Sequence, residues 1–157
     1  RLDRDTTGLI VLAKHALSAA VLSQAMRSRE IHRTYQAFAL GETAASGTID
    51  APIARLNGSL IQRTVDFASG ERSVTIRALL VFSHLELNLE TGRTHQIRVH
   101  MAYIGHPLLG DTLYNKTPGT FPRQALHSAS LSFVHPITGE PLNFHAPLPE
   151  DMQNLLT

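Results

Sequence analysis

Short segments in which apolar and polar residues alternate constrain the fold of this chain more than any other feature of its sequence. Leu85, Leu87 and Leu89 alternate with polar residues, a pattern typical of an antiparallel strand with one buried face. Comparable patterns, bounded by turn-forming residues, predict strands at residues 33–40, 48–53, 62–67, 73–81, 84–89, 129–134 and 142–146. Helical spacing of apolar residues predicts helices at 16–29 and 93–104, and a short one at 151–156.

This order of elements predicts an α+β fold with a mixed, largely antiparallel sheet and a few packed helices. The reason is that strands follow one another without strict alternation with helices. A length of 157 residues suits one domain with a sizeable core, so we expect residues 1–157 to form a single domain. The sequence contains neither an internal repeat nor a low-complexity segment.

The composition excludes several classes of function. The chain has no cysteine, which rules out disulfides, thiol catalysis and zinc bound by cysteine. Its formal net charge is only +1, so a surface that binds nucleic acid would have to be a local patch. No apolar run approaches the roughly 18 residues that a membrane-spanning helix needs. These features are typical of a cytoplasmic protein that does not associate with membranes.

A first polar cluster occupies residues 1–7, directly before Gly8. It combines two arginines and two threonines with the acids Asp3 and Asp5. The following residues, 9–13, are aliphatic, which predicts a strand buried inside the sheet. We therefore expect the polar cluster at the mouth of a core strand, where a rigid element holds polar groups still.

A second unusual stretch covers residues 91–100, where basic and amide side chains gather without any acid. In a helix, Ile97, Met101 and Ile104 share one face, and we expect this face to point inward. The other faces carry cationic or hydrogen-bonding side chains, namely Arg93, His95, Gln96, Arg98 and His100. Because a merely solvated face normally mixes both signs of charge, this pattern predicts an anion-binding surface.

Nine histidines raise the question of a metal site, but their spacing argues against one. Two ligands on one helix face need a spacing of three or four residues. His95 and His100 are too far apart along the chain for that and would point about 140° away from each other. The other histidines lie on separate predicted elements, so we expect no bound metal.

Five segments, in order along the chain, resemble the motifs of the RluA-type RNA pseudouridine synthases. They are R-L-D-R-D-T-T-G-L at 1–9, R-T-Y at 33–35, I-D-A-P-I at 49–53, the block from T-G-R-T-H-Q-I-R-V-H at 91–100 through G-H-P-L-L-G-D-T-L-Y at 105–114, and L-H-S with F-V-H-P at 126–128 and 133–136. Each segment alone is a weak signal. Together and in order they are highly specific, and they cover essentially the whole chain.

The resemblance implies the pseudouridine synthase catalytic fold and an isomerase that converts specific uridines of ribosomal or transfer RNA to pseudouridine. It implies that Asp3 is the catalytic carboxylate, which acts as nucleophile or base while the glycosidic bond is broken and the base is re-attached through C5. It places Arg98 beside Asp3 as the cation that offsets burial of the carboxylate. It also packs Ile97 against the base and stacks Tyr35 on the flipped uracil, where the phenol is a candidate for a proton-transfer step.

The same resemblance assigns Arg1 to the space that the flipped base leaves in the RNA. Lys14, Arg93, His95 and Gln96 are then candidates for contacts with RNA phosphates, which would make binding dependent on salt despite the low net charge. The expected partner is a structured RNA, bound by a monomer. The implied chemistry needs neither a cofactor nor a metal.

The start of the chain departs from the family pattern, because the histidine expected before Arg1 is absent. The resemblance therefore implies the carboxy-terminal portion of a catalytic domain, without its amino-terminal strands or a separate RNA-binding domain. One alternative function is a non-catalytic RNA-binding fragment of such an enzyme. Another is a hydrolase with Asp3 and Asp5 as an acid–base pair, although carboxylates two residues apart on one strand lie too close together for an inverting glycosidase.

Overall fold

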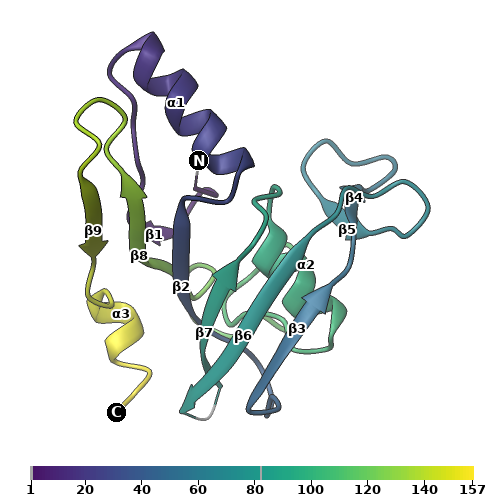
Figure 1. The fold of residues 1–157 in the computed structure, drawn as a ribbon. Coiled ribbons are helices and arrows are strands. Elements are labelled where there is room, and N and C mark those ends of the chain that lie inside the picture. Colours follow the sequence, from purple (N-terminus) through teal and green to yellow (C-terminus); the bar gives the residue numbers. More distant parts are fainter. Residues whose placement is uncertain (1, 82) are drawn as a thin grey trace.

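A mixed β-sheet forms the body of the molecule, and a computed structural model describes it for residues 2–81 and 83–157 (Figure 1). The sheet has seven strands in the order β1-β8-β2-β7-β6-β3, with β9 also paired to β8, and β4 and β5 form a separate hairpin. The strands are β1 (Thr7–Gly8), β2 (His32–Phe38), β3 (Ser46–Asp50), β4 (Ile53–Arg55), β5 (Arg63–Val65), β6 (Val74–Val81), β7 (His84–Leu89), β8 (Leu126–Val134) and β9 (Pro141–His145).

The pairing is antiparallel throughout the described sheet, except that β1 runs parallel to β8. The helices are α1 (Ala16–Arg27), α2 (Gln96–Tyr103) and α3 (Glu150–Gln153). This arrangement confirms the predicted α+β class with a mixed, largely antiparallel sheet. The segment predicted as one strand at 48–53 is divided, because Ala51 and Pro52 separate β3 from β4.

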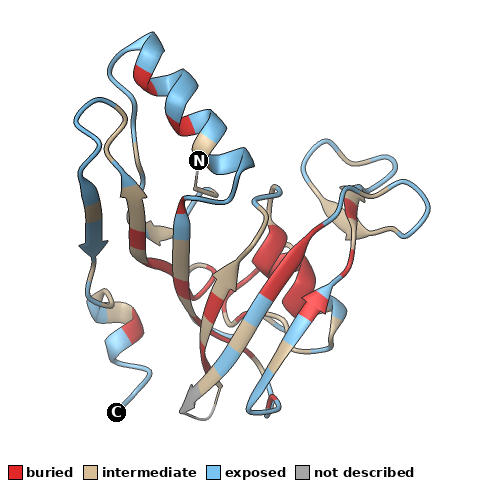
Figure 2. Ribbon diagram, in the orientation of Figure 1, coloured by how far each residue is buried: buried red, intermediate tan, exposed pale blue. Residues whose placement is uncertain are grey.

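The main hydrophobic core joins α2 to the central strands of the sheet. Leu85 and Leu87 of β7 and Met101 of α2 are fully buried in it. The alternation of leucines in β7 therefore predicted the buried face of this strand correctly. Figure 2 shows burial concentrated in α2 and the middle of the sheet, whereas α1 and β9 are largely exposed.

Residues 9–13 do not form the buried strand that their aliphatic sequence predicts. Strand β1 ends at Gly8, and Ile10 and Leu12 are 48% and 76% exposed. The pairing of β8 explains the difference. Strand β1 pairs with the beginning of one edge of β8, β9 takes the same edge from Ser130 onward, and β2 covers the opposite edge. The chain after Gly8 therefore meets an edge that is already occupied.

Helix α2 begins at Gln96, later than the predicted start at Arg93. His95, the residue before the helix, has a φ of 57°, in the left-handed region that few residues other than glycine adopt. The side-chain oxygen of Gln96 accepts the backbone N–H of Arg93 at 3.0 Å, so a turn held by a side chain replaces the first predicted turn of helix. Ile97 and Met101 point into the core as predicted.

Candidate active site

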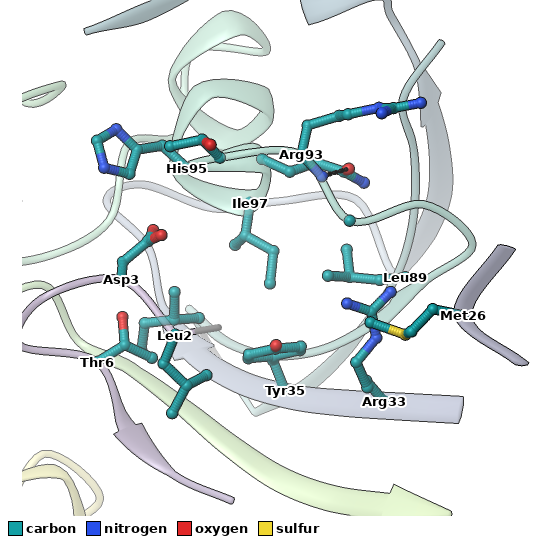
Figure 3. Close-up of a pocket in the computed structure, with 14 residues that line it drawn as sticks. Leu2, Asp3, Thr6, Met26, Arg33, Tyr35, Leu89, Arg93, His95 and Ile97 are labelled. Atoms are coloured by element: carbon teal, nitrogen blue, oxygen red, sulfur yellow. Dashed lines mark hydrogen bonds between the residues drawn. The ribbon is translucent and has the colours of Figure 1, made fainter. Parts of the chain in front are cut away.

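A hollow opens between the amino-terminal segment, β2 and the loop before α2 (Figure 3). Asp3 lines it from the amino-terminal segment, Tyr35 from β2 and Ile97 from the first turn of α2. The other lining residues are Leu2, Thr6, Met26, Arg33, Leu89, Gly92, Arg93, Thr94, His95, Gln96 and Leu126. The two polar clusters that stand out in the sequence, far apart along the chain, thus meet at one place.

Asp3 and Arg98 face each other beside this hollow. Nη1 of Arg98 lies 3.8 Å from Oδ2 of Asp3, and the side chains are only 7% and 15% exposed, respectively. Asp111 binds the same guanidinium through Nε at 2.7 Å and Nη2 at 2.8 Å. The contact between Asp3 and Arg98 is therefore present, as the family resemblance implies. Asp111, which forms the shorter contact with Arg98, was not among the site residues predicted from the sequence.

Arg98 carries its charge inside the protein. Burial acts to lower the pKa of its guanidinium, but the hydrogen bonds and charge of Asp111, together with the charge of Asp3, raise that pKa above its ordinary value. The Cζ atom of Arg98 also lies 5.1 Å from the centre of the Tyr114 ring, a cation–π contact. Arg98 is therefore a permanent cation next to Asp3.

Gln124 holds the loop that carries Asp3. Its Nε2 donates to the Arg4 carbonyl at 2.5 Å and to the Thr6 hydroxyl at 3.1 Å. These two acceptors follow Asp3 closely in the chain, so one amide fixes both the backbone and a side chain of the loop. The loop is thereby tied to the segment that leads into β8.

His127 of β8 fixes the end of the same loop. Its Nε2 lies 3.1 Å from the Ala146 carbonyl, which only accepts hydrogen bonds, so Nε2 carries the proton. Nδ1 is then an acceptor, and the Thr7 hydroxyl donates to it at 2.9 Å. Burial lowers the pKa of His127, which favours this neutral form.

Gly8 lets β1 approach β8 very closely. Its φ is 103°, and a Cβ atom added to it would lie 2.2 Å from the backbone oxygen of Ser128. The same oxygen accepts the backbone N–H of Leu9 at 2.9 Å. A side chain at position 8 would therefore separate the loop from β8, which explains the need for glycine here.

Tyr35 and Ile97 lie on opposite sides of the hollow (Figure 3). Both residues are buried, and Leu2 and Leu89 extend the apolar wall around them. Burial raises the pKa of Tyr35 above its ordinary value, so the phenol stays protonated at neutral pH. A slot between an aromatic ring and an aliphatic side chain suits the flat ring of a nucleobase.

His95 borders the hollow on the side of Asp3 (Figure 3). Its Nδ1 lies 2.7 Å from the hydroxyl of Tyr114, which accepts the backbone N–H of Arg63 at 2.9 Å. Burial lowers the pKa of His95, although the charge of Asp3 opposes this shift. A neutral imidazole that accepts from Tyr114 keeps its proton on Nε2, so His95 offers one hydrogen-bond donor.

Gln96 is turned into the protein rather than toward an anion. It is 3% exposed. Its amide nitrogen donates to the Val74 carbonyl and the Thr75 hydroxyl, and its oxygen accepts from the Thr91 hydroxyl. With its amide engaged in this way, its placement favours support of the loop before α2 over the predicted contact with an RNA phosphate.

His100 and Arg98 also point inward, so the predicted anion-binding surface on this helix is wrong. His100 is fully buried, between the Thr75 hydroxyl at 2.9 Å and the Ala51 carbonyl at 2.9 Å. The pattern of residue types correctly indicated polar faces. Their partners, however, are the Thr75 hydroxyl of β6, the Ala51 carbonyl and the buried Asp111, and buried polar groups need such partners.

The remaining predicted RNA-binding residues are scattered. Arg93 and His95 line the hollow, and Arg93 also forms an ion pair with Glu71. Lys14 is exposed in the connection before α1 and does not line the hollow. Arg1 lies outside the described residues.

Asp5 is exposed and forms an ion pair with Arg4 at 3.7 Å. It has a φ of 66° in the turn that follows Asp3, and it does not line the hollow. This placement does not support a hydrolase in which Asp3 and Asp5 act as an acid–base pair.

A second, more polar hollow adjoins the first and shares Gly92, Arg93 and Thr94 with it. Arg55 and Arg63, directly opposite each other in the β4–β5 hairpin, also line it. Like charges at directly opposed positions destabilise a strand pair. Among the described residues neither arginine forms an ion pair. Glu71 also lines this hollow and pairs with Arg93, so Arg55 and Arg63 supply its net positive charge.

The described residues contain no group of three or more histidine, aspartate or glutamate side chains placed to hold a metal ion. Most of the histidines instead form hydrogen bonds with neighbouring polar groups, as when His84 contacts Gln36 at 3.0 Å. Within the same residues, no helix has both the length and the apolar character required to span a membrane.

Comparison with protein families matches residues 1–103 to the family described as RNA pseudouridylate synthase. The chain is 50% identical over 161 residues to YjbO of Bacillus subtilis (strain 168), named an uncharacterized RNA pseudouridine synthase, with 99% of this chain and 56% of the relative covered. It is 46% identical over 172 residues to ribosomal large subunit pseudouridine synthase D of Vibrio cholerae, with 97% of this chain and 52% of the relative covered. The chain therefore spans about half the length of the curated relatives it matches.

Two solved human structures share the fold. RNA Pseudouridylate Synthase Domain Containing 1 superposes with a TM-score of 0.80 at 26% identity, over 94% of this chain and 66% of that one. RNA Pseudouridylate Synthase Domain Containing 4 superposes with a TM-score of 0.77 at 24% identity, over 99% of this chain and 72% of that one. The second likeness is evidence for the fold alone.

Proposed function

The chain belongs to the RNA pseudouridylate synthase family, and from this premise we propose that it converts uridine to pseudouridine in RNA. The observation that carries the proposal is the half-buried Asp3 carboxylate, which lies beside the Arg98 cation and an apolar slot. We propose further that residues 1–157 act as one catalytic domain. The support is that segments far apart in the chain meet at this slot and share one core.

The reaction is an internal transfer of the base, so it needs no second substrate. The bond from ribose C1′ to uracil N1 breaks, the uracil rotates, and a bond from C1′ to C5 forms. C5 loses a proton and N1 gains one, so the product is an isomer of the substrate. The protein has to supply a reactive group, a surface that holds the released base, and groups that handle one proton.

Asp3 is the reactive group in this proposal. It acts as a nucleophile at the sugar or the base, or as a base that deprotonates the sugar. All of these roles require an ionised carboxylate, which burial disfavours and a nearby cation favours. The position of Nη1 of Arg98, 3.8 Å from Asp3, supplies that cation.

Tyr35 and Ile97 hold the base after it has left its stack in the RNA. The two side chains border the slot from opposite sides, as a stacking surface for uracil requires (Figure 3). The raised pKa of Tyr35 makes the phenol a hydrogen-bond donor at neutral pH and a poor base. If Tyr35 takes part in proton transfer, it therefore starts as the protonated phenol.

The RNA backbone on either side of the flipped nucleotide would follow the adjoining polar hollow. Arg55, Arg63 and Arg93 line that hollow together with Glu71, and in this proposal the arginines supply the local positive charge that the low net charge of the chain does not. Arg33, at the edge of the slot, adds a further cation. Binding through these arginines makes affinity strongly dependent on salt.

The substrate that we propose is a structured ribosomal RNA. The support is the 46% identity to a relative named for the large ribosomal subunit. A transfer RNA is the other substrate to include in the test. We propose that the protein acts as a monomer, because Asp3, Tyr35, Ile97 and Arg98 come together within the described part of one chain.

The test is to incubate the purified protein with transcripts of ribosomal and transfer RNA and to map pseudouridine by carbodiimide modification and primer extension. We expect pseudouridine at one or a few positions of the ribosomal transcript. Pseudouridine in transfer RNA alone would change the substrate. Its absence from both would contradict the proposal, and maps of RNA from a strain without the gene provide an independent check.

A domain that binds RNA without turnover is the second candidate, because the chain spans only 56% of one close relative. An assay of this chain beside a version extended at its amino terminus separates the two functions. Comparable turnover by both proteins supports a catalytic domain within residues 1–157. RNA binding without turnover by the shorter protein alone supports the second candidate.

A further inference from the structure

The carboxylate of Asp111 accepts four hydrogen bonds close to the site. Asp111 is fully buried. Its Oδ2 accepts Nε–H of Arg98 at 2.7 Å, and its Oδ1 accepts from Nη2 of Arg98 at 2.8 Å. Oδ1 also accepts the backbone N–H groups of Leu113 at 3.0 Å and Tyr114 at 3.2 Å. Four donors bind this carboxylate, three at Oδ1 and one at Oδ2, and together they fix its orientation.

This orientation fixes the direction of the guanidinium group. A guanidinium is planar, and binding one carboxylate through Nε and Nη2 leaves Nη1 on the opposite edge. Nη1 is the nitrogen that lies 3.8 Å from Asp3. The turn that Asp111 caps also places the ring of Tyr114 against the guanidinium, with its centre 5.1 Å from Cζ. Asp111 therefore determines which edge of the Arg98 guanidinium faces Asp3, and it places the Tyr114 ring on the face of that group.

The two carboxylates divide the interactions of Arg98 unequally. Asp111 receives the short hydrogen bonds, whereas 3.8 Å is within ion-pair distance and beyond hydrogen-bond distance. Arg98 thus brings a positive charge next to Asp3 but places no short hydrogen bond on its oxygens. A carboxylate that has to react with a substrate needs this combination, because a short bond to the cation would occupy the reacting oxygen.

We propose that Asp111 is a positioning residue for the reaction. It holds Arg98 so that Nη1 faces Asp3 at ion-pair distance and does not close onto it. This inference rests on the proposed function, since it assigns Asp3 the reactive role. Without Asp111, Arg98 would either move onto Asp3 or turn away from it, and turnover would fall in both cases.

The first test is Asp111→Asn, measured as kcat and KM on the RNA substrate. The Asn oxygen still accepts from the backbone of Leu113 and Tyr114, while its NH2 group opposes Nε–H of Arg98, donor against donor. We expect kcat to fall by about 100-fold, the scale of a misplacement near 1 Å, with KM changed by less than about threefold. A kcat close to that of the unsubstituted protein would overturn the proposal.

Asp66→Asn is the matched control. Oδ1 of Asp66 accepts the backbone N–H groups of Ala68 at 2.8 Å and Ser69 at 3.3 Å, the same turn geometry as at Asp111 without an arginine partner in the described structure. We expect kcat and KM of this variant to match those of the unsubstituted protein. An equal loss of kcat in both variants would mean that capping a turn, and not holding Arg98, explains the effect.

A double-mutant comparison keeps the test decisive if Asp111→Asn alone does not fold. Arg98→Gln with Asp111→Asn replaces the buried ion pair by two neutral amides that can bond to each other. If Asp111 acts through Arg98, the double variant has the same kcat as Arg98→Gln alone. A further drop of tenfold or more, beyond about 1.4 kcal/mol, would show an independent role for Asp111 and overturn the proposal.

A spectroscopic measurement separates failure of this inference from failure of the proposed function. The Nε–H proton of Arg98, bonded to Asp111, gives a slowly exchanging arginine signal in a proton–nitrogen NMR spectrum without RNA. We expect that signal to disappear in Asp111→Asn and to persist in Asp66→Asn. If the Arg98 signal is present but neither the unsubstituted protein nor any variant forms pseudouridine, the proposed function is contradicted, whereas the geometry of Arg98 is supported. Absence of the signal from the unsubstituted protein would contradict the positioning role itself.

Discussion

The hydroxyl of Thr7 donates a 2.9 Å hydrogen bond to Nδ1 of His127 and thereby ties the loop that carries Asp3 to β8. The proton of the neutral His127 ring is on Nε2, which donates it to the Ala146 carbonyl, so Nδ1 carries no proton and can only accept. Thr7 is therefore the donor that this ring requires. The bond links the position of a reactive group to the protonation state of a residue that does not line the slot.

Thr7→Val tests this link. Valine keeps the size of threonine and removes the donor, so the buried Nδ1 of His127 is left without a partner. We expect the free energy of unfolding to fall by about 1–3 kcal/mol. Urea denaturation measures the change, and Thr48→Val, at an exposed position of β3, is the control for which we expect no loss. Equal effects in both variants would contradict the role of the hydroxyl.

Asp3→Asn separates chemistry from binding. The amide keeps the shape of the carboxylate but cannot serve as nucleophile or base, so we expect turnover to fall by more than about 10⁴-fold. RNA affinity should stay within about threefold, because the RNA is held mainly through its phosphates. Single-turnover assays and filter binding provide the two numbers. Substantial turnover in this variant would reject Asp3 as the reactive group.

The arginines of the β4–β5 hairpin are expected to control the salt dependence of RNA binding. Removal of one phosphate contact by Arg55→Gln should reduce the slope of log K against log salt by about 0.7–0.9, and adding Arg63→Gln should roughly double that change. Arg77→Gln, which removes one charge outside both hollows, should leave the slope unchanged. Identical slopes for Arg55→Gln and Arg77→Gln would place the RNA elsewhere.

Stability is expected to decrease on acidification below neutral pH. Burial lowers the pKa values of His84, His95, His100 and His127, so the unfolded chain binds more protons than the folded one as the pH falls. The stabilisation is complete above the pKa of an unfolded histidine, about 6.5, and is lost progressively below it, by at most about 1.4 kcal/mol per pH unit for each ring. Urea unfolding between pH 5 and pH 7.5 measures the slope.

A single variant identifies one source of that slope. His100 accepts from the Thr75 hydroxyl and donates to the Ala51 carbonyl, so its neutral form is part of the fold. His100→Gln should flatten the pH dependence, whereas His15→Gln, at an exposed position before α1, should not. An unchanged slope in His100→Gln would mean that this ring does not titrate on unfolding.

The sequence predicted those features that depend on neighbouring residues. The leucines of β7 show their buried face by alternation alone, and the spacing of Ile97 and Met101 shows the inner face of α2. Features that depend on strand pairing between segments far apart in the chain could not be predicted from the sequence. Residues 9–13 have the composition of a buried strand, but only the complete sheet shows that β9 already occupies the edge they would need.

The same limit explains which parts of the candidate site were missed. Residue types at 91–100 indicated a polar helix, but they do not reveal that Gln96 and His100 have buried partners on β6. Asp111 lies in a segment that was recognised only for its family resemblance. The available signal was the residue type, an aspartate that follows Gly110 in a turn-rich segment. Aspartate side chains often accept the backbone N–H groups two and three residues further on, as Asp111 does from Leu113 and Tyr114, and such an aspartate is held in place to orient a cation.

The close approach of Gly8 to Ser128 sets a constraint on length rather than on charge. With Gly8 fixed against the backbone of β8, the number of residues from Asp3 to Gly8 determines where the Asp3 carboxylate lies. The insertion or deletion of one residue in this segment would move the carboxylate away from Arg98 even if every charged side chain were retained. Across related proteins, the residue at exposed position 4 should therefore vary freely in identity, position 5 should be restricted to residues such as glycine, asparagine and aspartate that adopt a positive φ, and the number of residues should stay constant.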